Sequence, residues 1–150
     1  MYKWCNGSSE ILTKYNTKES NDAVDNKIVL DLEDDVAHME LGGSWRMPTD
    51  AEWNELYNSC TWEWTTWNGI KGYKVTSEIA GYSDKSIFLP ASGYRKDAQL
   101  YSTVSSGYYW SSSLVATIPE YAWRLCFSSS YSHINRGGRC YGYSVRPVTE

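Results

Sequence analysis

Residues able to do chemistry gather in the last third of the chain, in the stretch YAWRLCFSSSYSHINRGGRCYGYSVRPV at residues 121–148. Its phenols, guanidinium groups, thiols, imidazole and amide can donate or accept hydrogen bonds, stack, or ligate a metal ion. Within YAWRLCFS the alternation sends Trp123, Leu125 and Phe127 to one face of a strand and the residues between them to the other. We expect the first set to be buried and the second to be presented.

The following segment, SSSYSHINRGG at residues 128–138, reads as a polar, flexible loop. Its composition is that of an antibody-type paratope, in which Tyr gives rigid contact area while Ser, Gly and Asn give adaptable hydrogen bonds. Clusters of Ser and Gly also mark loops that have no function. The composition alone leaves both interpretations open.

Catalytic and metal-binding patterns are weak. His38 and His133 are the two histidines of the sequence, and neither lies in a ligand motif. The acidic run at residues 31–35 lacks the glycine and the distal glutamate of an EF-hand calcium loop, so we interpret it as the start of a helix. A carboxylate pair for glycoside hydrolysis depends on the fold and stays open. We expect a non-enzymatic protein with no cofactor and no metal.

Four cysteines, Cys5, Cys60, Cys126 and Cys140, allow two disulfides in any of three pairings. Cys126 and Cys140 fall in segments predicted to be neighbouring strands, so this pair is the most plausible bridge. Free thiols are an equal alternative.

The distribution of charge excludes some partners. The net charge is −4, and nine acidic residues precede Gly42, whereas Arg without Lys follows Leu100. A nucleic-acid-binding protein would show a basic face, so no nucleic acid is expected. No apolar run reaches the roughly eighteen residues of a membrane span, and no signal peptide opens the chain. The start resembles a domain cut from a longer chain.

Local signals predict a single α+β domain of two helices and many short strands. Strands are expected at residues 10–16 and 27–32, a helix at 33–41, and a helix from about 50 to about 58 that a Thr49–Glu52 capping box begins. Asn68-Gly69 predicts a hairpin, with Trp62, Trp64 and, one step out of phase, Trp67 along one sheet face. Later strands are expected at 86–90, 108–113, 121–128 and 139–148. The predicted core is Trp45, Trp53, Leu56, Trp123, Leu125, Phe127 and Val145.

The segments GGSWRMPTDAEWNEL, SIFLPASGYR, GYYWSSS, AWRLCF and SVRPV resemble, in this order, the Fibrobacter succinogenes major paralogous domain, a relative of the formylglycine-generating, sulfatase-modifying fold. The resemblance covers about residues 30–148 and implies a C-type-lectin-like fold with two helices and a small mixed, mainly antiparallel sheet. The enzymes of that superfamily use a closely spaced cysteine pair, which Cys126 and Cys140 do not match. The calcium motifs of sugar-binding C-type lectins are also missing.

The ending is also similar to the variable proteins of diversity-generating retroelements, which place mutable positions in a fixed C-terminal frame ending in an Arg-Pro-Val-like strand. Here the frame is AW.L.F and R..G.SVRPV. The resemblance implies that the residues between the frame positions are diversified contact residues: Tyr121, Arg124, Cys126, Ser128, Tyr131, His133, Asn135, Cys140, Tyr141 and Tyr143.

The leading hypothesis is therefore a non-catalytic receptor-binding or adhesin domain, from a gut Bacteroidetes bacterium or its phage, that binds a protein or glycan on a cell surface. It would act outside the cell, on a cell surface or a virion tail, with a variable segment at about residues 109–148. Tyr121, Tyr131, Tyr141 and Tyr143 would be anchors, Arg124 and Arg136 charged forks, and His133 and Asn135 adaptable contacts. The alternatives are an oxidase relative using Cys126 or Cys140 and a structural module of a surface protein.

Overall fold

The computed structural model describes residues 11–149, so Cys5 and the first residue of the strand predicted at 10–16 lie outside it. Within this range the chain is α+β, with two helices and three small antiparallel sheets in the strand orders β1-β2-β3, β4-β5 and β6-β7-β8. Two 3-10 turns, η1 (Glu19–Asn21) and η2 (Leu32–Asp34), precede the helices. None of the helices in this range is both long and apolar enough to cross a bilayer.

The helix α2 begins where the sequence predicts, whereas α1 begins three residues later than the predicted start at residue 33, after the 3-10 turn η2. In α1 (Val36–Leu41) the Asp35 carboxylate accepts hydrogen bonds from the backbone amides of Ala37 and His38. In α2 (Asp50–Asn58) the Thr49 hydroxyl accepts from the Glu52 amide, and the Glu52 carboxylate accepts from the Thr49 amide. These contacts satisfy amides that have no partner within the helix. The helix-start interpretation of the acidic run is thus confirmed for Asp35.

The first sheet joins β1 (Cys60–Trp67), β2 (Ile70–Ser77) and β3 (Ser86–Pro90). Asn68 and Gly69 turn the predicted hairpin with φ values of 50° and 80°, as a type I′ turn requires. Trp62 and Trp64 both pack edge-on against Tyr73, at 5.6 and 5.2 Å between ring centroids. Trp67 is an odd number of residues from them, so it lies on the other face, where it contacts Phe88. The expectation of three Trp on one face is wrong for Trp67.

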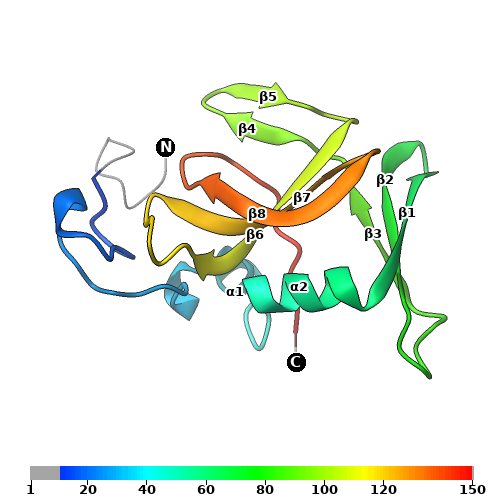
Figure 1. The fold of residues 1–150 in the computed structure, drawn as a ribbon, viewed down its shortest axis with the longest axis horizontal. Helices are drawn as coiled ribbons and strands as arrows, with labels where there is room; N and C mark the ends of the chain where they lie inside the picture. Colours follow the sequence, from blue (N-terminus) through cyan, green and yellow to red (C-terminus); the bar gives the residue numbers. More distant parts are fainter. Residues whose placement is uncertain (1–10, 150) are drawn as a thin grey trace.

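The third sheet carries the main core. It joins β6 (Ser106–Leu114), β7 (Tyr121–Ser128) and β8 (Tyr131–Gly138), and α2 lies along one of its sides (Figure 1). Leu125 and Phe127 point to that side and are fully buried in one cluster with Trp53 of α2. We call this side of the sheet the core face and the opposite side the outer face.

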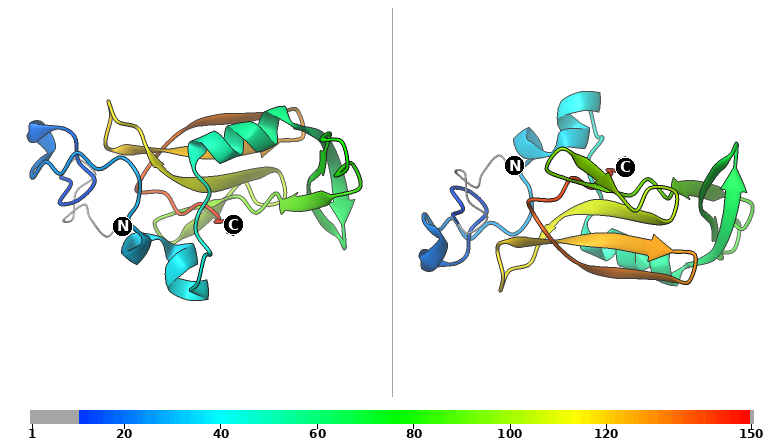
Figure 2. Two further views of the ribbon diagram at one scale, coloured as in Figure 1. Left: turned by 90° about the horizontal axis from the view of Figure 1, so that it is seen from below. Right: turned by 90° about the horizontal axis from the view of Figure 1, so that it is seen from above.

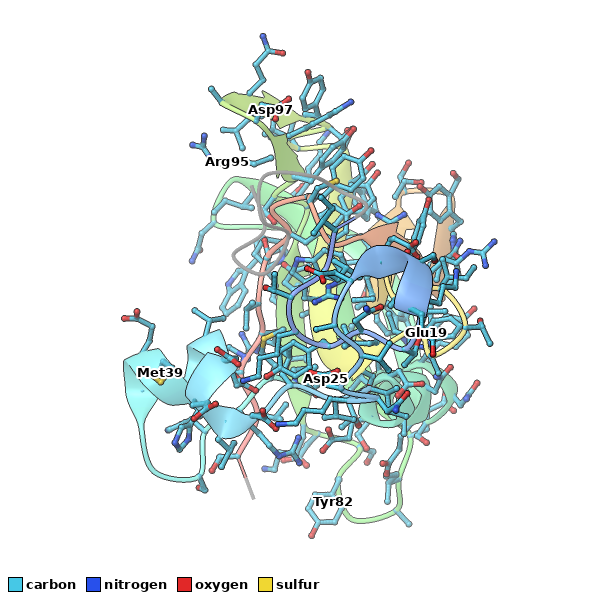
Figure 3. The ribbon with its side chains drawn as sticks, turned by 90° about the vertical axis from the view of Figure 1, so that its left-hand side faces the viewer. Glu19, Asp25, Met39, Tyr82, Arg95 and Asp97 are labelled. Carbon is cyan, nitrogen blue, oxygen red and sulfur yellow. The ribbon has the colours of Figure 1, made fainter. Side chains whose placement is uncertain are left out.

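The second sheet is the short hairpin of β4 (Tyr94–Lys96) and β5 (Gln99–Tyr101), which lies on the side of the third sheet away from α2 (Figure 1). Arg95 and Asp97 mark its projecting end in Figure 3. The chain after residue 138 contacts β4 through an Arg95–Gly142 bridge and β6 through a Tyr109–Ser144 bridge. It thereby fastens the hairpin to the sheet.

Four sequence predictions about strands are wrong. Of residues 128–138, expected as a loop, 131–138 form β8, because a turn at Ser129 and Ser130 brings them alongside β7 in continuous register. Residues 139–148, expected as a strand, make isolated bridges and no ladder. Residues 11–16 and 27–32 form no strand; the Asp25 carboxylate instead accepts hydrogen bonds from the Tyr15 and Asn16 amides and shapes a loop.

The predicted core is confirmed in part. Trp53, Leu125 and Phe127 are buried, whereas Leu56, Trp123 and Val145 are only half-buried. Trp45 is exposed, and its prediction is wrong. It follows α1, which projects from the body of the molecule (Figure 2), so no sheet face is available to cover the ring.

The N-terminal segment packs at the end of the third sheet opposite to β1–β3 (Figure 2). Its fully buried Tyr15 lies in a second cluster with Leu114 and Ala122 on the outer face. The buried guanidinium of Arg139 donates to the backbone carbonyls of Tyr15 and Pro119 at 2.9 and 2.7 Å. The N-terminal segment therefore covers this end of the outer face. It does not cover the end nearer to β1–β3.

Candidate functional site

On the part of the outer face that the N-terminal segment does not cover, the side chains form rows that run across β6, β7 and β8. The strand register aligns Trp110, Arg124 and Asn135 in one row and Tyr108, Cys126 and His133 in the next. Ser106, Ser128 and Tyr131 form a third row. Alternate residues of a strand point to the same side of a sheet, so nine residues distant in sequence share one surface.

Tyrosines extend this surface toward the β4–β5 hairpin. Tyr143 stacks on Tyr108 at 5.3 Å and on Tyr141 at 5.7 Å between ring centroids, and its ring lies 4.3 Å from that of Trp110. Tyr94 meets Tyr108, Tyr141 and Tyr143 edge-on. Edge-on and offset contacts of this kind are the favoured geometries of aromatic pairs. We call the following residues the aromatic cluster: Tyr94, Tyr101, Tyr108, Trp110, Tyr141 and Tyr143.

Arg124 lies between the aromatic cluster and β8. Its guanidinium carbon is 4.9 Å from the centroid of Tyr108 and 4.8 Å from that of Tyr143, within the range of a cation–π contact. The side chain is half-buried, and its Nε is buried without a hydrogen-bond partner. Burial raises the pKa of the Tyr143 phenol, and the Arg124 charge partly opposes that rise. The phenol therefore remains a hydrogen-bond donor at neutral pH.

Cys126, His133 and Asn135 form a polar group on the same surface. The Cys126 Sγ lies 3.3 Å from His133 Nε2, and the Asn135 Nδ2 lies 3.3 Å from the same nitrogen. A nucleophilic triad would need the third residue on the other ring nitrogen, to orient the base. Cys126 is 2% exposed, and burial raises the pKa of its thiol. The thiol is therefore poorly suited to nucleophilic attack, and it lies beneath the contact surface, where it supports His133.

The structure brings together eight of the eleven residues that the sequence nominates. Six lie on the outer face and two beside it in the aromatic cluster: Arg124, Cys126, Ser128, Tyr131, His133, Asn135, Tyr141 and Tyr143. Tyr121 and Arg136 lie on the core-face side, where the Arg136 guanidinium is 5.9 Å from the Tyr121 ring. Cys140 is exposed just beyond the end of β8.

The predicted Cys126–Cys140 disulfide is wrong for this structure, in which Cys60, Cys126 and Cys140 are free. Cys126 pairs with His133, whereas Cys140 follows Gly138, which pairs with Tyr121. Five residues of strand therefore separate the two thiols, roughly 16 Å at the usual rise per residue. A disulfide requires Cα atoms within about 7 Å.

The acidic residues within 31–34 form ion pairs with Lys14. Asp31, Glu33 and Asp34 gather their carboxylates around the Lys14 ammonium, which lies 3.1 Å from Asp31 and 3.0 Å from Glu33. Hydrogen bonds to these carboxylates, with Asp34 first, raise the pKa of Lys14. The cluster is accounted for as an ion-pair network that anchors the N-terminal segment.

Sequence reasoning missed four members of the aromatic cluster: Tyr94, Tyr101, Tyr108 and Trp110. Alternation along the predicted strand at residues 108–113 could have placed Tyr108 and Trp110 on one face. Nothing local to Tyr94 predicts its contact with Tyr143, because that contact joins the β4–β5 hairpin to the C-terminal segment. Tyr101 joins the cluster through its stacking on Tyr94.

Comparison with protein families gives one match. The model of a domain of unknown function (DUF8237) matches residues 77–148. This range includes β3 through β8 and the segment with Tyr141 and Tyr143. It thus contains the whole outer face and the aromatic cluster. Neither the curated proteins nor the solved structures gave a match.

Proposed function

We propose that the chain is a non-catalytic ligand-binding domain of C-type-lectin-like fold, acting as a receptor-binding or adhesin module. Its contact surface is the open outer face together with the aromatic cluster. One observation carries the proposal: eight of the eleven residues nominated from the sequence share one side of the molecule. Tyr, Arg, Ser, Asn and His on a fixed support are the usual composition of a binding surface.

The two faces of β7 explain how such a surface can vary without loss of the fold. Leu125 and Phe127 fill the core, while Arg124, Cys126 and Ser128 alternate with them on the outer face. A substitution on the outer face leaves the packing of the core face in place, because side chains on the two sides of a strand do not share neighbours. This supports a diversified surface of the retroelement type.

The ligand would be a protein or glycan on a cell surface, and the domain would act outside the cell, on a cell surface or virion tail. Population sequencing tests the diversification. Sequences encoding residues 109–150 from many cells should differ mainly at the outer-face positions, and the differences should match adenines of a nearby template repeat. Uniform sequence with no template would contradict it.

Binding is tested by substitution on the two sides of the sheet. The wild-type domain is first screened against arrays of glycans and bacterial surface proteins, and the affinity for each ligand found is measured. Tyr131 is 43% exposed, and Tyr131→Ala or Tyr141→Ala should cost about 1–3 kcal/mol of binding free energy. Tyr121→Ala, on the other side of the sheet, is the matched control and should leave the affinity unchanged.

Equal losses for Tyr121→Ala and Tyr131→Ala would contradict this assignment of the surface. If no substitution on either side changes any affinity, the domain is better explained as a structural module of a surface protein.

A further inference from the structure

The arginines among residues 11–149 differ in the groups that accept hydrogen bonds from their guanidinium. The Arg46 guanidinium donates to both carboxylate oxygens of Glu52, at 2.8 and 2.7 Å, and that of Arg139 donates to backbone carbonyls. Arg124 has no carboxylate and no hydrogen-bond acceptor among residues 11–149, although its Nε is buried. Its observed contacts are the faces of Tyr108 and Tyr143.

The guanidinium of Arg124 therefore has N–H donors without a hydrogen-bond acceptor among residues 11–149. A guanidinium carries five N–H donors and cannot lose its charge at physiological pH. Contact with aromatic faces offsets part of the desolvation cost, but it supplies no acceptor for the N–H groups. Buried polar atoms are normally paired, and the Arg124 Nε has no acceptor among residues 11–149. A carboxylate on the Nη groups of the same guanidinium would offset part of the cost of that burial.

The charges around Arg124 favour an incoming anion. The sequence from Tyr121 to Thr149 holds no Asp or Glu and four Arg. The nearest acidic residue in the sequence, Glu120, accepts a hydrogen bond from Asn21 at 2.6 Å and lies 3.9 Å from the Lys18 ammonium. It is therefore engaged with the N-terminal segment. An anion approaching the outer face meets no competing carboxylate from this part of the chain.

We propose that Arg124 receives a carboxylate from an Asp or Glu side chain of a protein partner, with the phenols of the aromatic cluster around it. This deepens the proposed function and rests on it. A planar carboxylate matches the two parallel donors of a guanidinium. One guanidinium balances the single charge of a carboxylate, whereas a phosphate dianion would need further cations.

A protein partner fits the aromatic cluster better than a sugar does. Sugar-binding platforms present a free ring face, whereas Tyr94, Tyr108, Tyr141 and Tyr143 contact one another and are half-buried. Their edges and hydroxyl groups remain for contacts with side chains and backbone. Surfaces of Tyr, Ser, Asn and Arg of this kind are typical of protein recognition.

The test observes the Arg124 Nε–H directly by NMR in the ¹⁵N-labelled domain, assigned by its loss in Arg124→Lys. The probes are a capped pentapeptide of alternating tyrosine and glutamate, the same peptide with glutamine for glutamate, N-acetylneuraminic acid, and sodium sulfate. The glutamate peptide should shift the Nε–H signal saturably, and the glutamine peptide should not.

Two variants test whether binding of the glutamate peptide requires the guanidinium of Arg124. Arg124→Lys keeps the charge but loses the fork, so it should bind the glutamate peptide about tenfold more weakly or worse. Arg136→Lys, on the other side of the sheet, is the matched control and should bind like the wild type. A backbone amide spectrum that matches the wild type shows that each variant is folded.

Three outcomes would overturn the proposal. Saturable binding of N-acetylneuraminic acid without the glutamate peptide would make the partner an acidic glycan. A shift with sulfate alone would mark a general anion site. The absence of any shift would show that Arg124 binds none of these anions. In that last case, weaker ligand binding by Tyr131→Ala would still support the proposed binding function. Unchanged ligand binding by Tyr131→Ala would contradict both the binding function and the carboxylate site at Arg124.

Discussion

Leu125 shows how a single residue supports the surface behind it. It has no exposed area and lies on β7 between Arg124 and Cys126, which point the other way. Leu125→Ala should lower the free energy of unfolding by about 2–5 kcal/mol, because the apolar transfer energy is lost and a cavity remains. Urea unfolding measures it.

The matched control is Leu100→Ala on the β4–β5 hairpin, where the side chain is 56% exposed. This substitution should change the free energy of unfolding by less than about 0.5 kcal/mol. Comparable losses in the two variants would contradict the assignment of Leu125 to the main core.

At the scale of an element, the start of α2 depends on a charged side chain. The Glu52 carboxylate accepts from both Nη atoms of Arg46 and from the backbone amide of Thr49. The hydrogen bonds from Arg46, followed by those from Thr49, lower the pKa of Glu52 to about 2. A carboxylate whose pKa is lower in the folded state stabilises that state above its unfolded pKa and loses this contribution on protonation.

Glu52→Gln should therefore lower the free energy of unfolding at pH 7, and the difference from the wild type should shrink as the pH falls from about 4.5 toward about 2. Urea unfolding across this range measures it. Glu55→Gln, an exposed residue of the same helix, is the control and should show a smaller difference at pH 7. A Glu52→Gln difference that does not depend on pH would show that the ion pair contributes nothing.

At the scale of the whole molecule, Arg139 joins the N-terminal segment to the end of the third sheet. It is 6% exposed and donates to the carbonyls of Lys14, Tyr15 and Pro119. Arg139→Gln cannot reach all three acceptors, and each buried acceptor left unpaired costs about 1–3 kcal/mol. The N-terminal segment should then loosen while the main core stays folded.

Hydrogen exchange measured by mass spectrometry distinguishes the two regions. Peptides from residues 12–30 should lose protection in Arg139→Gln, and peptides from β7 should keep most of theirs. Arg95→Gln on the projecting hairpin (Figure 3) is exposed and should leave both regions unchanged. A uniform loss of protection would show that the N-terminal segment and the sheet unfold as one unit.

Features encoded by neighbouring residues could be predicted from the amino-acid sequence. The Thr49–Glu52 capping box begins α2, Asn68-Gly69 turns the β1–β2 hairpin, and strict alternation defines the two faces of β7. Each signal lies within a few residues, because caps, turns and strand periodicity act over one or two turns of backbone. Alternation could therefore place Arg124, Cys126 and Ser128 on one face, whereas most other candidate contact residues were named from the resemblance of the C-terminal frame.

Which of those residues share a surface depends on how the strands pair. The pairing of residues 131–138 with β7 turned an expected loop into a strand, brought Arg124 beside Asn135 and placed Tyr121 and Arg136 on the other side. The contact of Tyr94 with Tyr143 joins residues 49 positions apart. These outcomes depend on register and on contacts across the sheet, whose energies come from partners distant in the chain. For that reason no local pattern could show that Arg124 lies among tyrosines and has no counter-charge within residues 11–149.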